Sequence, residues 1–170
     1  MSTGQMMLTT GAIILLGMTV LTVNGMYGNH GTILRQTEIG IYATSLGTSM
    51  IEEASGMNFD EKTVNDAIYA TSSLTSSGSL GAESGETTTP DSAINFDDFD
   101  DYNNRVFGMK VAGVDTFTIR TYVYYVTNSS PYLQQTSTPT WLKKLDLKIS
   151  SFAMTDTVKM SYIFSYFNFR

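Results

Sequence analysis

The chain of 170 residues carries a formal net charge of −6 with only ten Lys and Arg residues, which argues against a nucleic-acid partner because phosphate binding needs clustered cationic side chains. It contains no cysteine, so disulfides and thiolate metal sites are excluded and any extracellular domain must be held together by packing alone. Charged residues make up 15% and hydrophobic residues 42% of the chain, a composition that predicts one domain joined to a strongly apolar segment.

The apolar segment covers residues 6–23, where only Thr and Gly interrupt the hydrophobic residues. At about 1.5 Å per residue, a helix of this length extends about 27 Å, close to the thickness of a bilayer core. The alternative of a buried helix in a soluble domain would use most of the core available to so short a chain. A secretory signal is disfavoured because no positive charge precedes Met6. We therefore predict a helix that can span a membrane.

Apolar residues then recur at intervals of three and four between Ile39 and Ala54, which predicts an amphipathic helix with its apolar side on another element. Gly56 is suited to end it. Together the two parts predict one helix of about 50 residues, from Met6 to Ser55, which is too long for a single globular domain.

Glycine is concentrated near the middle of this helix, and each glycine costs up to about 1 kcal/mol relative to alanine. We expect a partly unwound segment near residues 24–31, which would separate an apolar helix within residues 1–31 from an amphipathic helix over residues 32–56. The alternative is close backbone approach between packed helices, which small residues permit in an apolar setting. The glycines at the expected break are Gly25, Gly28 and Gly31.

Helical periodicity is absent from residues 57–104. Residues 71–89 are dominated by Ser, Thr and Gly, which predicts an exposed loop, either a long solvated connection or a variable surface. Residues 96–103 (FDDFDDYN) combine aspartates with aromatic residues. Such carboxylates can gather Ca²⁺, although the EF-hand spacing is missing; the alternative is an acidic turn whose aromatic rings dock on the core. The candidate calcium ligands are Asp97, Asp98, Asp100 and Asp101.

Four segments rich in β-branched and aromatic residues occupy the last third of the chain. They cover residues 106–111, 115–127, 142–150 and 157–167, and residues 128–140 form a longer loop between the second and third. The pattern predicts an antiparallel sheet of about four strands within residues 105–170, with one face available to the amphipathic helix. The expected fold class is therefore α+β.

Residue types that carry catalysis are scarce. The only histidine is His30 in the glycine-rich region, and no nucleophile elbow, phosphate loop or metal-ligand spacing is present. We expect a protein that is not an enzyme and that needs no cofactor.

The order of these parts resembles type IV pilins and the pseudopilins of type II secretion over the whole chain. Residues 49–54 (SMIEEA) followed by residues 59–61 (FDE) look like the end of the long helix in minor pilins of the mannose-sensitive haemagglutinin type. Residues 96–103 are similar to an acidic motif of those proteins, and residues 141–167 resemble their closing hairpin.

The resemblance implies a subunit that inserts in the cytoplasmic (inner) membrane, is cut by a prepilin peptidase, and is extracted by pilus assembly machinery into a helical homopolymer at the cell surface for adhesion or motility. Gly4 could precede the cut, which would make Thr9 the fifth mature residue; with Met1 as first mature residue, the fifth is Gln5. Neither carries the charge of the glutamate usual there, so we expect the subunits to register differently from those of the familiar pilins.

The same apolar segment would form the core of such a filament, because copies of one helix offer cover equivalent to lipid and a repeated heterologous contact gives an open helical polymer. Two alternatives remain open: a pseudopilin or minor pilin of a type II secretion-like machine, and a single-span membrane-anchored binding module. The filament-core residues are Met6, Met7, Leu8, Ile13, Ile14, Leu15, Leu16, Met18, Val20, Leu21 and Val23.

Overall fold

The computed structural model describes residues 2–89, 92–129 and 131–169. The chain separates into two compact units, residues 1–38 and residues 39–170. The first unit consists of the first part of helix α1 (Thr3–Ser55), and the second contains the remainder of α1 and all later elements.

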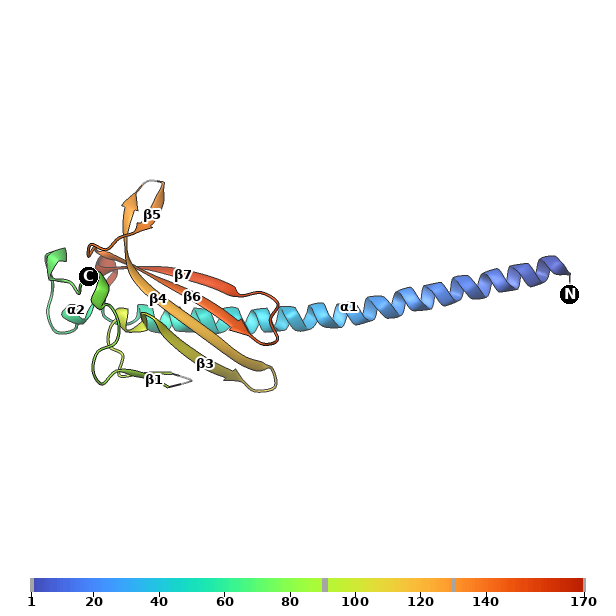
Figure 1. The fold of residues 1–170 in the computed structure, drawn as a ribbon, viewed down its shortest axis with the longest axis horizontal. Coiled ribbons are helices and arrows are strands. Elements are labelled where there is room, and N and C mark those ends of the chain that lie inside the picture. Colours follow the sequence, from blue (N-terminus) through green and yellow to red (C-terminus); the bar gives the residue numbers. More distant parts are fainter. Residues whose placement is uncertain (1, 90–91, 130, 170) are drawn as a thin grey trace. The chain divides into compact units, whose positions relative to one another are not determined.

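Helix α1 is continuous through the glycine-rich region (Figure 1), so the expected unwound segment near residues 24–31 is wrong. Gly25, Gly28 and Gly31 lie in helical backbone, and the space where a Cβ would stand on each is open. Intrinsic propensity is a weak prior that a long run of helical neighbours overrides. The helix continues through these glycines, which only leave it without side chains at their positions.

The second unit is built on the expected antiparallel sheet, and the α+β class is confirmed. Four of its strands have the order β3-β4-β6-β7. The central strand β4 pairs with β3 through residues 115–121 and with β6 through residues 117–125. The strands are β3 (Arg105–Val111), β4 (Asp115–Ser129), β5 (Tyr132–Gln135), β6 (Leu142–Ser151) and β7 (Val158–Ser165).

Strand β5 lies in the segment expected to be a loop and is the fifth strand of this sheet. Strand β4 continues beyond its pairing with β6, and its last residues, Val126 to Ser129, pair with β5 (Figure 1). All four residues of β5 are exposed, so its sequence has no alternation of buried and exposed positions that would identify a strand.

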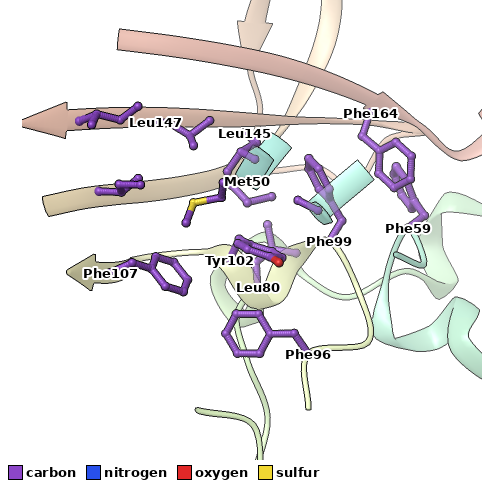
Figure 2. Packing of buried hydrophobic residues seen from close by; sticks show 14 of the residues in the cluster. Met50, Phe59, Leu80, Phe96, Phe99, Tyr102, Phe107, Leu145, Leu147 and Phe164 are labelled. Carbon is purple, nitrogen blue, oxygen red and sulfur yellow. The ribbon is translucent and has the colours of Figure 1, made fainter. Parts of the chain in front are cut away.

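The second half of α1 packs on one face of this sheet, as the periodicity predicted. Ile39, Ala43, Met50 and Ala54 are buried in one cluster with side chains of β4 and β6, and Figure 2 shows Met50 beside Leu145. The helix passes close to the sheet at Gly47, where an added Cβ would lie 2.5 Å from Met160 Sδ and 2.6 Å from Ile149 Cδ1.

The connection between α1 and the sheet is partly buried, contrary to the exposed loop expected over residues 71–89. Leu74 and Leu80 are only 6% and 8% exposed and belong to the core. Single leucines among Ser and Thr have no periodicity that would reveal their burial. The short elements after the long helix are α2 (Glu61–Asn65), η1 (Thr71–Ser73), η2 (Ser77–Ser79), β1 (Thr87–Thr89), β2 (Ser92–Ile94), η3 (Asp100–Tyr102) and η4 (Tyr166–Phe169).

Candidate functional site

The first candidate site is the apolar surface of the first unit. Its best 18-residue window has a mean hydropathy of 2.0, so α1 is long and apolar enough to cross a membrane. The eleven apolar side chains expected to form a filament core, from Met6 to Val23, are between 44% and 76% exposed. A helix that is apolar on all sides belongs in lipid or among other helices, since water is its least favourable surrounding.

The polar groups of residues 6–23 are satisfied within the helix itself. The hydroxyls of Thr10, Thr19 and Thr22 donate to the carbonyls one turn earlier at 2.7–2.9 Å, and that of Thr9 donates to Met6 O at 3.0 Å. A hydroxyl that bonds back to its own helix needs no partner from water. The threonines therefore do not prevent this segment from leaving water.

The predicted processing site lies at the start of α1. Gly4 has open space where a Cβ would stand, and the Gln5 side-chain oxygen accepts the backbone N–H of Ser2 at 3.3 Å. These contacts are local to the first turn and leave both residues exposed.

The second candidate site is a cluster of buried charges around Lys143 on β6. The Lys143 ammonium donates to an oxygen of Asp100 and, at 2.7 Å, to the backbone carbonyl of Phe59, and it lies 3.5 Å from Asp60 Oδ1. All three charged side chains are almost completely buried. The rings of Phe59 and Tyr125 lie within cation–π distance, 4.7 and 5.3 Å from the ammonium.

The burial of Lys143 could have been predicted from the sequence. Every second residue of β6 points to the core, namely Leu145, Leu147 and Ile149. Two residues before Leu145, the same series includes Lys143. A lysine at an inward position of a strand needs a buried anion. Asp60 and Asp100, from two distant parts of the connection, supply that charge.

Asp98 extends the cluster as a neutral acid. Its Oδ1 accepts the backbone N–H groups of Asp100 at 2.7 Å and Asp101 at 3.2 Å. Burial, and then the nearby charges of Asp100 and Asp101, raise the pKa of Asp98 to about 10. Asp98 therefore holds a proton at neutral pH, and its carboxyl lies beside that of Asp100. Burial also raises the pKa of Asp100, against the opposing effect of Lys143.

The structure does not bring the four predicted calcium ligands together at one point. Asp97 is exposed, Asp98 and Asp100 belong to the Lys143 cluster, and Asp101 instead lies beside Glu83 and Glu86. The aromatic residues between them dock on the core: Figure 2 shows Phe99 and Tyr102 among buried side chains. The alternative of an acidic turn anchored by its rings describes this segment better than a single four-aspartate site.

The buried charges around Lys143 are suited to stabilising the fold of the head. The Lys143 ammonium joins β6 to two segments of the connection, and none of the three charged side chains reaches solvent to meet a substrate. Removing one member would leave the others buried without a counter-charge, which is strongly destabilising. The comparisons with protein-family models, curated proteins and solved structures return no match.

Proposed function

We propose that this chain is a structural subunit of a helical, type IV pilus-like filament, in which residues 6–23 are buried against the same residues of other copies. The observation that supports this most directly is the exposed apolar surface of the first unit, which covers the helix on all sides.

The free energy involved is large. Each Leu, Ile, Val or Met side chain that leaves water contributes about 1.5–3 kcal/mol, so the exposed apolar side chains from Met6 to Val23 together contribute on the order of 20 kcal/mol. That is more than the usual net stability of a whole domain. An isolated subunit dissolved in water would have to leave this surface exposed, so we expect the helix to be always in lipid or in contact with other helices.

The distribution of apolar residues around the helix favours a polymer over a small closed assembly. A dimer covers one stripe of each helix, whereas the apolar residues here occupy every side. In a helical bundle each subunit has neighbours in several directions, and a heterologous contact that does not close repeats without limit. Helices also exchange lipid for one another at little cost, because lipid tails are as apolar as leucine.

The second unit supplies what such a filament needs on its outside. Its outer sheet face carries exposed polar residues such as Arg120, Lys148 and Lys159, while its core is formed by the sheet and the second half of α1. A head with its own core can remain folded while the apolar segment moves from membrane to filament.

Residence in the cytoplasmic membrane before assembly, cleavage by a prepilin peptidase, handling by pilus assembly machinery, and a role in adhesion or motility belong to the same proposal and rest on the family resemblance. The fifth residue would be neutral with either Gln5 or Thr9. A neutral residue avoids an unpaired carboxylate inside an apolar core, which is costly.

Electron microscopy of sheared surface material from cells that produce the full chain tests the proposal. We expect filaments from the wild type, loss of filaments with Leu15→Asp, and normal filaments with Leu15→Met, which keeps position 15 apolar. Leu15 is 67% exposed, so neither variant should unfold the head.

A single engineered cysteine provides a second measurement, because the chain has none of its own. With Leu15→Cys, we expect oxidation to join neighbouring copies, since their helices would be in contact. Monomers embedded in the bilayer, with neither filaments nor cross-links, would contradict the filament and support the membrane-anchored module. Short assemblies confined to the cell envelope would instead support the pseudopilin alternative.

A further inference from the structure

A second group of carboxylates lies apart from Lys143. Glu83 and Glu86 lie in the turn before β1, and Asp101 lies in η3. These two segments are distant in the sequence and contact each other in the structure. One carboxylate oxygen from each of the three lies within 4.8 Å of the others. Like charges at this separation repel unless something positive stands between them.

Asp101 has an oxygen that none of the described N–H or O–H groups satisfies. The residue is fully buried, and its Oδ2 accepts the backbone N–H groups of Asp97 at 3.0 Å and Asp98 at 3.2 Å. Its Oδ1 is equally buried but receives no hydrogen bond from the described residues. The Asp101 carboxyl lies beside that of Glu86. A buried carboxylate oxygen without a donor costs free energy, and a bound cation would remove that cost.

The nearest guanidinium is occupied with backbone groups. Arg105 donates from Nε to Asp101 O at 3.3 Å and from Nη2 to Ala82 O at 3.4 Å, and its guanidinium lies over the Phe96 ring at 5.8 Å. These bonds hold the Glu83 turn against η3. Among the described residues, the ion pairs involve Lys143 and Lys144 and none includes Arg105.

The turn that carries the two glutamates is shaped by its own hydrogen bonds. The Glu83 backbone N–H donates to Glu86 Oε2 at 2.6 Å, the Glu86 N–H donates to Glu83 O at 3.3 Å, and Asn95 Nδ2 donates to Gly85 O at 3.1 Å. Gly85 has φ +109°, a backbone conformation that favours glycine. The Glu86 carboxylate is therefore held within the turn, and one oxygen of each glutamate lies within 4.8 Å of an Asp101 oxygen.

The two acidic groups differ in the cation available to them. Around Lys143, an ammonium from the chain neutralises Asp60 and Asp100. Around Asp101, three carboxylates meet without such a group among the described residues.

We propose that Glu83, Glu86 and Asp101 bind a divalent cation, and that this cation is Ca²⁺. Ca²⁺ prefers oxygen ligands and accepts about six to eight of them in irregular geometry, whereas Mg²⁺ needs a near-octahedral shell. Glu83 is exposed and Glu86 half-buried, so water can complete the shell. The bound ion fastens the turn before β1 to η3. The site does not depend on filament formation.

Calorimetric titration of the detergent-solubilised full chain with CaCl₂ at pH 8 tests the site. We expect one Ca²⁺ per chain with a dissociation constant on the order of 10⁻⁴–10⁻³ M, the range of extracellular modules, and weaker binding of Mg²⁺. Calcium should also raise the melting temperature of the head beyond the effect of NaCl at equal ionic strength.

Two variants and a matched control locate the ion. Glu83→Gln and Asp101→Asn each remove one charge, and we expect each to weaken binding at least tenfold. Asp97→Asn removes a charge from an exposed neighbour that lies near Glu86 but outside the group of three ligands, and it should weaken binding far less than either of these variants. If Asp101→Asn does not fold, Glu83→Gln still decides, because Glu83 is exposed. Absence of calcium binding by the wild type, or loss with Asp97→Asn alone, would overturn the site.

Discussion

Replacing Asp98 by Asn should stabilise the head at neutral pH, although it changes a fully buried residue. Asn keeps an oxygen that can accept the backbone N–H groups of Asp100 and Asp101, which Asp98 Oδ1 accepts now. Its amide NH₂ takes the place of Asp98 Oδ2, which is buried and receives no hydrogen bond from the described residues. The substitution therefore imitates the neutral form of Asp98 and removes the need to bind a proton on folding.

The magnitude follows from the two pKa values of Asp98. In the unfolded chain the pKa is about 3.9, and in the folded protein it is raised to about 10. Because the folded value is the higher one, the contribution of Asp98 to stability is complete below about pH 4 and decreases as the pH rises towards 10. Each pH unit corresponds to about 1.4 kcal/mol, so at pH 7 the loss is on the order of 4 kcal/mol. At pH 7 the free energy of unfolding of Asp98→Asn should therefore exceed that of the wild type by about 1–4 kcal/mol.

Urea unfolding of the full chain in a non-ionic detergent provides the measurement. The only tryptophan, Trp141, lies in the head and stacks on Tyr166 with ring centroids 4.8 Å apart, so its fluorescence reports unfolding of the head while the apolar helix stays in the micelle. The stability difference between variant and wild type should grow by up to about 1.4 kcal/mol per unit from pH 5 to pH 8. Comparison at each pH cancels the titration of Asp101 and other carboxyls. A difference that does not change with pH, or a variant less stable than the wild type at pH 8, would show that Asp98 is ionised in the folded protein.

Three further predictions use the same unfolding assay. Lys143→Met leaves two carboxylates buried without a counter-charge and should cost about 3–5 kcal/mol at pH 7. The loss should be smaller at pH 4, because burial raises the pKa of Asp100 and a protonated Asp100 needs no counter-charge; equal losses at both pH values would contradict the cluster. Gly40→Ala meets open space and should stabilise the head by up to about 1 kcal/mol, whereas Gly47→Ala meets Met160 and Ile149 and should be at least about 1 kcal/mol less stable than Gly40→Ala; equal stabilities would disprove the close approach. Phe99→Ala, at a side chain with no exposure, should cost about 3–5 kcal/mol, while Phe152→Ala, at a fully exposed one, should have no effect; a loss at both would mean that burial does not decide.

The parts of the fold that the sequence predicts well are those in which one side of an element is buried. The intervals from Ile39 to Ala54 and the alternation from Leu145 to Ile149 reflect burial against a neighbour, and the structure has a helix and a strand there. Strand β5 and the buried Leu74 lack such a pattern. One is an exposed strand that exists because β4 is longer than its partners, and the other is a single anchor between polar residues.

The sites were less predictable because they depend on contacts between distant residues. The density of aspartates in residues 96–103 indicated a cluster of charges. The sequence could not show that Asp100 faces Lys143 while Asp101, its neighbour, faces Glu83. The direction of each side chain is set by the short η3 turn. The apolar segment proposed as a filament core required no such knowledge, since an uninterrupted apolar helix is recognisable without its neighbours.

The position of Lys143 also bears on the order in which the head folds. The ammonium bonds to Phe59 and Asp100, which precede it by 84 and 43 residues. During synthesis from the N-terminus, the connection emerges with its acidic side chains long before β6 exists to neutralise them. Contacts with such separation slow folding, because long loops must close first. We therefore expect the connection to dock late, after α1 has already been made and β6 has joined the sheet.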